Sequence, residues 1–181
     1  MKGIYFFTDY ICPKLTWVKR FRHLDLYSIA ALSLLLSITS CSTNDLYEKT
    51  VTLSHHEWNN VYKPSFTFNI KDTAAAYDIF FIIRHTDRYN YNNIYINLIT
   101  KQPGADSTQK ARYDLTLATD AEGWRGTGMD DIYEHRIRLT PANLEFHFRK
   151  AGTYTFQLEQ IMRENPLKNV LNVGLRVEKK Q

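Results

Sequence analysis

Cys41 has the sequence context of a lipid attachment site. It ends the run of residues 36–41, LSITSC, in which small residues occupy the two positions before the cysteine. A basic leader and an apolar stretch, residues 26–38, precede it. This order is typical of a bacterial lipoprotein signal, whose cleavage leaves an acylated cysteine at the new N-terminus. The sequence therefore predicts a mature protein that begins at Cys41 and is anchored to a membrane facing an extracytoplasmic space.

Two other interpretations of this segment are an ordinary secretory signal peptide, with the cysteine there by chance, and an uncleaved membrane anchor. The apolar stretch of about a dozen residues is shorter than the roughly 20 that a transmembrane helix needs. The small residues directly before Cys41 favour a cleaved lipoprotein signal over both alternatives. We expect residues 1–40 to be the signal peptide, 41–49 a lipidated flexible tether, and 50–181 one folded domain.

The charge and cysteine content exclude several classes of function. Five lysines and arginines face only two acidic residues in the leader, so the mature part has a formal charge near +1 and its basic pI does not indicate nucleic-acid binding. The two cysteines are Cys12, in the leader, and Cys41. The folded domain therefore has no thiol for a disulfide or a cysteine nucleophile.

Alternation of apolar and polar residues with a period of two predicts β-strands throughout the mature chain. The alternating segments are 66–70, 94–99, 113–117, 137–139, 154–159 and 173–178, and the continuous apolar run 79–83 predicts a central strand buried on both faces. Turn residues separate these segments, and a helix is expected only in brief pieces such as 164–170. The predicted fold is all-β, an antiparallel β-sandwich of about seven to eight strands.

Histidines are the first candidates for metal binding. His55 and His56 are adjacent, and on an extended segment adjacent side chains point to opposite faces, so the two cannot bind one ion together. The other histidines of the mature chain, His85, His135 and His147, have no ligand spacing. The sequence predicts no metal site and no cofactor.

Carboxylates are the candidates for hydrolysis, because a glycosidase needs two of them across a cleft. Glu145, Glu159 and Glu164 are available, but nothing in the sequence pairs them. No catalytic triad spacing is present, and the run Gly123–Gly128 lacks the lysine of a phosphate-binding loop. The sequence predicts no catalytic residue and a protein that is not an enzyme.

Aromatic and polar residues in turns are the candidates for binding. Tyr89 and Tyr91, in the asparagine-rich segment 88–93, could stack on a sugar or form a protein-binding surface, or else cover the end of the core. Trp58 and Trp124 also fall in turn-rich segments, where a tryptophan either fills the core or anchors a ligand.

The run 159–170, EQIMRENPLKNV, interrupts the strand pattern. Its Asn165 precedes a proline, which disfavours helical backbone angles there. The run is either a strand connection with specific hydrogen bonds or a partner-binding edge. As partner-binding residues we therefore consider Tyr89, Tyr91, Trp124, Arg163 and Asn165.

The mature chain resembles the GldH-type gliding motility lipoproteins of the Bacteroidota. The most specific segment is 159–167, flanked by 152–156 and 173–177, with support from Tyr77, residues 83–84, the tyrosine and asparagine segment 89–93 and the glycine-rich run 123–128. Together these segments extend from about residue 47 to residue 178. The resemblance implies a component of the gliding machinery, which in this phylum is tied to type IX protein secretion, and it implies no catalytic activity.

We therefore expect a non-enzymatic, lipid-anchored envelope protein that binds other gliding or secretion components. Only Asp45 is acidic near the lipid attachment site, so the dense acidic tether of surface-exposed lipoproteins is missing, which favours the periplasmic face. A second hypothesis is a glycan-binding lipoprotein that uses Tyr89, Tyr91, Trp58 or Trp124 as stacking residues. A third is a hydrolase of envelope polymers, for which no acid and base pair can be assigned.

Overall fold

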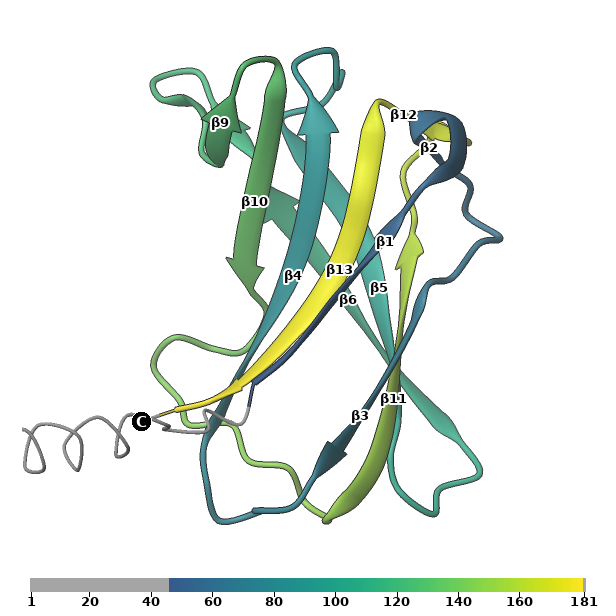
Figure 1. Ribbon diagram of the computed structural model, residues 1–181, viewed down its shortest axis with the longest axis vertical. Helices are drawn as coiled ribbons and strands as arrows, with labels where there is room; N and C mark the ends of the chain where they lie inside the picture. The colour runs from purple at the N-terminus through teal and green to yellow at the C-terminus, as the bar shows by residue number, and fades with distance from the viewer. Residues whose placement is uncertain (1–45, 181) are drawn as a thin grey trace, which may run out of the picture. The chain divides into compact units, whose positions relative to one another are not determined.

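The computed structural model describes residues 46–180, which form an antiparallel β-sandwich (Figure 1). Cys41, the signal peptide and the first residues of the expected tether lie outside the described residues. One sheet has five strands in the order β1 (Leu46–Thr52), β13 (Val170–Lys179), β4 (Tyr77–Thr86), β10 (Ile132–Arg138) and β9 (Thr127–Met129). The second has four strands in the order β3 (Ser65–Ile70), β11 (Gly152–Gln160), β5 (Asn93–Lys101) and β6 (Thr108–Thr116).

Two short strand pairs complete the described fold. β12 (Leu167–Lys168) pairs with β2 (Glu57–Trp58), and β7 (Ala118–Thr119) pairs with β8 (Gly123–Trp124). The predicted all-β sandwich is confirmed, with nine strands in the two large sheets rather than seven or eight. The 164–170 segment forms β12 and not a helix, and the helical piece is a 3-10 turn at Ser54–His56.

Strand β1 begins inside the segment that the sequence analysis assigned to the tether. Leu46–Lys49 pair with β13, and the antiparallel register continues from Leu46 opposite Glu178 to Thr52 opposite Asn172. These residues are too polar to predict a strand by themselves. Pairing with β13 satisfies their backbone groups, and Tyr47 and Val51 pack against the core.

The core lies between the inner faces of the two sheets. Phe66, Phe68 and Ile70 of β3 are buried, as their alternation with polar residues predicts. β4 is buried on both faces along residues 81–83, which confirms the predicted central strand. Aromatic rings fill much of the space between the sheets, and the Phe68 and Phe156 rings meet edge to face with centroids 5.0 Å apart.

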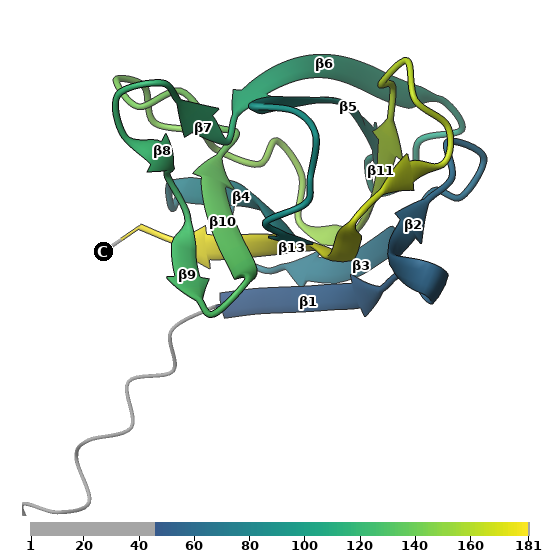
Figure 2. The same cartoon turned by 90° about the horizontal axis from the view of Figure 1, so that it is seen from above.

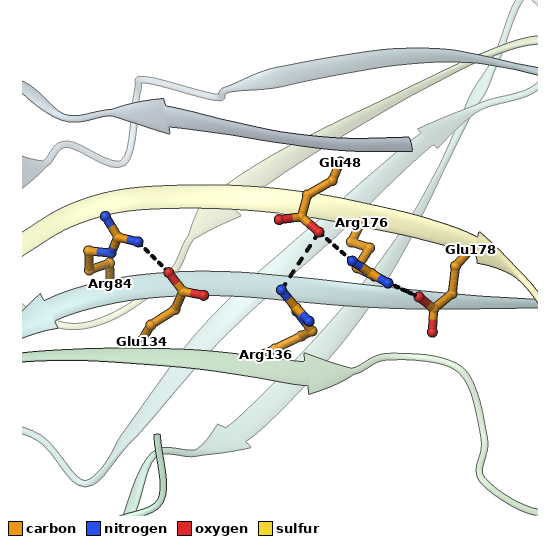
Figure 3. A network of polar contacts seen from close by, with 6 residues as sticks. All are labelled: Glu48, Arg84, Glu134, Arg136, Arg176 and Glu178. Atoms are coloured by element: carbon orange, nitrogen blue, oxygen red, sulfur yellow. Dashed lines mark hydrogen bonds and ion pairs between the residues drawn. The ribbon is translucent and has the colours of Figure 1, made fainter. Parts of the chain in front are cut away.

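The outer face of the five-stranded sheet has a network of ion pairs (Figure 3). Glu48 of β1 binds Arg176 of β13 at 2.7 Å and lies 3.7 Å from Arg136 of β10. Arg176 also binds Glu178, and a separate pair joins Arg84 to Glu134. Because these side chains are partly exposed, each pair contributes only about 0–1 kcal/mol. Their common effect is to link strands that are distant in the sequence.

The direction of the strands divides the connecting loops between two ends of the sandwich. β1 begins at one end of the sandwich, and the antiparallel β13 ends there, because Leu46 lies opposite Glu178 (Figure 1). Segments 71–76, 102–107 and 139–151 connect strands at this end and are called the near loops. Segments 59–63, 87–92 and 161–169 connect strands at the opposite end and are called the far loops. The far loops contain most of the residues that the sequence singled out for binding.

Candidate functional site

A buried glutamine organises two of the far loops. Gln160, at the end of β11, is fully buried, and its Nε2 donates to the Trp58 carbonyl oxygen at 3.1 Å. Its Oε1 accepts from the Met162 backbone N–H at 2.8 Å. The Trp58 indole Nε1 in turn donates to the Tyr62 carbonyl oxygen at 3.0 Å. These bonds fix segment 161–166 against segment 58–62, so both loops are positioned by the core.

Arg163 and Asn165 lie side by side in this region but have different roles. The Oδ1 of Asn165 accepts from the Asn60 backbone N–H at 2.9 Å and from Gln160 Nε2 at 3.4 Å. The Asn165 side chain therefore joins the two loops. The peptide bond between Asn165 and Pro166 is cis. The Arg163 side chain is exposed, so its guanidinium is available to a partner.

The two tyrosines of segment 87–92 differ in burial. Tyr89 is buried, its hydroxyl donates to the Asn93 carbonyl oxygen at 3.1 Å, and burial raises its pKa. Tyr91 is half-buried, and its ring meets the Tyr89 ring edge to face. Partial burial, followed by a hydrogen bond to Glu164, raises the Tyr91 pKa. Tyr91 therefore belongs to the surface formed with segment 161–166, and Tyr89 supports it from below.

Apolar residues of segment 59–63 extend this surface. Val61 is 80 % exposed and Tyr62 is 48 % exposed, so both side chains are accessible to a partner. Nothing in the sequence singles out these two residues, because one valine next to one tyrosine forms no recognisable pattern. The candidate partner-binding surface therefore consists of Val61, Tyr62, Tyr91 and Arg163, with Asn165 holding its loops together.

Trp124 packs in a cluster with two buried histidines, on the other side of Tyr89 from Tyr91 in the chain of ring contacts. The His85 and His135 Nε2 atoms are 2.9 Å apart, and the Trp124 ring lies 4.4 Å from the His85 ring. Tyr89 and Tyr133 complete the cluster, with ring centroids 5.0 and 5.9 Å from that of His85. The pair was missed at the sequence level, although His85 continues the inward-facing series Ile79, Phe81 and Ile83.

Both histidines are neutral in this environment. Burial lowers the pKa of His85, and burial followed by repulsion from His85 lowers the pKa of His135 to about 4. The Nδ1 of His85 lies 2.7 Å from the Thr86 carbonyl oxygen, so Nδ1 carries the hydrogen and Nε2 accepts from His135. The arrangement is a neutral hydrogen-bonded pair inside an aromatic cluster.

The glycine-rich run next to Trp124 makes room for this cluster. A Cβ at Gly126 would lie 2.5 Å from the Glu134 carbonyl oxygen and 2.9 Å from a carbon of the His135 ring. Only glycine allows the chain to pass so close to β10. The run therefore has a packing role here, which agrees with its lack of a phosphate-binding lysine.

The histidines considered for metal binding do not come together with other ligands. His55 and His56 are exposed in the 3-10 turn with φ of 57° and 56°, so the expectation of an extended segment was wrong. Left-handed angles at both residues reverse the chain between β1 and β2. Within residues 46–180, no three side chains of histidine, cysteine, aspartate or glutamate are grouped to hold an ion.

The carboxylates considered for hydrolysis are also dispersed. Glu145 is in a near loop, Glu164 is in a far loop, and Glu159 lies in β11. Glu159 binds Lys63 at 2.6 Å and accepts from Asn97 at 2.8 Å, and these hydrogen bonds hold its pKa at about 2. A glutamate with so low a pKa is ionised at neutral pH and does not act as a general acid.

Comparison with known proteins identifies relatives along most of the chain. A family model described as GldH lipoprotein matches residues 45–177. The gliding motility lipoprotein GldH homolog of Christiangramia forsetii is 27 % identical over 153 residues, covering 80 % of this chain and 90 % of the relative. The gliding motility lipoprotein GldH of Flavobacterium johnsoniae is 22 % identical over 130 residues, covering 68 % and 78 %. Among residues 46–180, no helix is long and apolar enough to cross a membrane.

Proposed function

Because this chain belongs to the GldH lipoprotein family, we propose that it is a non-enzymatic envelope protein that supports gliding motility or type IX secretion by binding other envelope components. Acyl chains on Cys41 attach it to a membrane, and the folded domain faces the periplasm. The family match supports a lipoprotein related to gliding motility, and within residues 46–180 the carboxylates considered for hydrolysis lie in different parts of the fold.

The observation that most supports this function is the position of the far loops relative to the start of β1. Five steps along the chain separate Cys41 from Leu46, a reach of at most about 18 Å when fully extended. The ten residues of β13 then span about 33 Å from the near end to the far end. An anchor at Cys41 would therefore keep the start of β1 within about 18 Å of the lipid, while the far loops lie at the other end of the strands.

Glycan binding receives less support from the positions of the aromatic residues. Trp58 and Tyr89 are buried, and Trp124 packs on the histidine pair. A sugar ring stacks on an exposed aromatic face, which Trp58 and Tyr89 do not offer and which the half-buried Tyr91 and Trp124 offer only in part. We therefore propose protein binding alone.

Replacing Cys41 by alanine tests the anchor and the function together. In the native host, we expect gene deletion to reduce gliding motility, and to reduce the amount of type IX cargo in the medium and on the cell surface. Wild-type protein should restore both, whereas Cys41→Ala should lose fatty-acid label and membrane association, because several acyl chains are needed for stable anchoring. Normal cargo and motility in the deletion strain, or full rescue by an unlabelled Cys41→Ala protein, would refute the proposal.

Replacing Arg163 by glutamate tests the partner-binding surface. The side chain is exposed, so we expect the melting temperature to stay within about 2 °C of wild type, as for most surface substitutions. Binding should weaken by about tenfold or more, because arginines at interfaces are often energetically dominant. In-cell crosslinking and cargo secretion measure this loss, with Lys49→Glu, the same charge change on β1, as the control. Equal effects of the two variants would contradict a far-loop surface.

A further inference from the structure

β6 has an unpaired edge in the part of the chain that the structure describes. It pairs with β5 over all nine residues, from Thr108 opposite Lys101 to Thr116 opposite Asn93. Within residues 46–180, no strand pairs with its other side, and Figure 2 shows β6 outermost in its sheet. Such an edge is a template for pairing with another chain.

The hydrogen-bonding pattern between β5 and β6 identifies which backbone groups of β6 point to the free edge. The Leu117 N–H donates to the Asn92 carbonyl oxygen at 2.8 Å, immediately beyond the end of the paired region. In an antiparallel ladder, alternate residues turn their N–H and C=O groups toward the same neighbour. Odd-numbered residues of β6 therefore bind β5, and even-numbered residues such as Lys110, Arg112 and Asp114 direct their backbone groups to the free edge.

A cavity of about 370 Å³ lies between the sheets beside this edge. Gln109, Ala111 and Tyr113, on the inner face of β6, line one side of it. The near-loop segment 139–149 lines the opposite side with Phe146 and Arg149. Buried aromatic rings of the core, including Phe156, form its floor. A strand added to β6 would direct every second side chain toward this cavity, whose floor is apolar and whose rim includes polar side chains such as Gln102 and Gln109.

The outer face of β6 has two positive charges, Lys110 and Arg112, and one negative charge, Asp114, which accepts from Asn93 Nδ2 at 2.9 Å. The excess of positive charge favours an acidic partner. Lys110 and Arg112 point to the outer face of β6, and the Arg112 guanidinium lies 5.1 Å from the centroid of the Tyr95 ring. Arg112 makes no ion pair with the described residues, whereas Lys110 binds Glu159 at 2.9 Å. Arg149 adds a further exposed positive charge on the other side of the cavity. Acidic side chains on the outer face of an added strand would lie opposite Lys110 and Arg112.

We propose that β6 is a docking site for an extended segment of a partner protein, which adds as a strand, places apolar side chains in the cavity and presents acidic side chains to Lys110 and Arg112. This site is separate from the far loops and gives the proposed partner-binding function a second contact. Backbone hydrogen bonds supply affinity in this mode, and the cavity supplies specificity for alternate side chains.

A displayed peptide library tests the site with the full chain, purified from host membranes into lipid nanodiscs. The library holds nine-residue peptides in which alanine, valine, leucine or phenylalanine alternates with aspartate, glutamate, serine or threonine. We expect enriched peptides to bind Arg112→Pro about tenfold or more weakly than wild type, since proline removes an edge N–H and its ring blocks the approach. Arg112→Ala, which loses the charge but keeps the N–H, should weaken binding by only about two- to fivefold.

A second variant separates strand addition from other outcomes. Ala111→Trp should fill the cavity and also weaken binding about tenfold or more, without altering the ladder to β5. In the wild-type complex, amide hydrogen exchange at Lys110, Arg112 and Asp114 should slow.

No enrichment on the wild-type protein would overturn the proposal. So would binding that Ala111→Trp abolishes and Arg112→Pro leaves intact, since the cavity would then bind an apolar ligand without backbone pairing. Neither result depends on the Cys41→Ala complementation, so failure of the strand site and failure of the proposed function are distinguishable.

Discussion

Replacing Gly174 by valine should disrupt the pairing of β1 with β13 and strongly destabilise the domain. A Cβ at Gly174 would lie 2.6 Å from the Thr50 Cγ2 and 2.7 Å from the Lys49 carbonyl oxygen. The methyl group could rotate away, but the carbonyl belongs to the paired backbone, so the two strands would have to separate. We expect a loss of about 3 kcal/mol or more in the free energy of unfolding, a large part of the roughly 5–15 kcal/mol that stabilises a typical domain.

Chemical denaturation of Gly174→Val measures this loss, and Asn172→Val is the matched control. Asn172 lies two residues earlier on the same face of β13, and its Nδ2 donates to Thr52 Oγ1 at 2.8 Å. Valine there removes one exposed hydrogen bond and meets no backbone carbonyl, so we expect a cost of about 1 kcal/mol or less. Adding Thr50→Ala to Gly174→Val should not restore stability, because the Lys49 carbonyl remains. Equal stability of the two valine variants would contradict this account of the contact.

Acidification should destabilise the domain through the His85 and His135 pair. Both pKa values are lowered in the folded state, His135 to about 4, whereas an unfolded histidine titrates near 6.5. Between these values the unfolded chain binds more protons than the folded one, so stability is full above pH 6.5 and falls as the pH decreases toward 4. For His135 alone the difference corresponds to about 3 kcal/mol. A proton added to His85 would go to its Nε2 and would place two N–H groups 2.9 Å apart.

Denaturation at a series of pH values from 7.5 to about 4.5 checks this expectation. His135→Gln keeps a donor for His85 Nε2 but does not titrate, so the pH dependence should become shallower. His147→Gln is the control, because it removes an exposed histidine of a near loop and leaves the buried pair intact. A slope in His135→Gln as steep as in wild type would assign the pH dependence to other groups.

The sequence predicted the strands whose alternation reflects burial. Segment 66–70 alternates buried with exposed residues, and segments 94–99 and 154–159 alternate buried with mostly half-buried residues. Their period of two follows directly from that arrangement. β1 was missed because Glu48 and Lys49 interrupt its apolar positions, and because its partner lies more than a hundred residues away. The pairing with β13 and the packing of Tyr47 and Val51 against the core stabilise it as a strand.

The candidate site was predicted less completely, for a physical reason that differs between residues. Trp58 and Tyr89 are large and amphipathic, so composition alone does not say whether the polar group meets solvent or a buried carbonyl oxygen. The structure gives each a backbone acceptor. Asn165 followed from the restriction that Pro166 imposes on its backbone. Val61 and Tyr62 are exposed only because Gln160 and Trp58 fix the loop beneath them, which no local pattern indicates.

The antiparallel pairing of β1 with β13 also decides how the domain responds to mechanical load. Tension applied through the chain before Leu46, against a hold on the far loops, acts along β1 and parallel to its seven paired positions. The hydrogen bonds of the ladder are then loaded in shear, all at once, rather than opened one at a time from an end. The ion pair between Glu48 and Arg176 crosses the same boundary and resists the same displacement. A moving machine could therefore pull on this domain through its first strand without peeling that strand from the sheet.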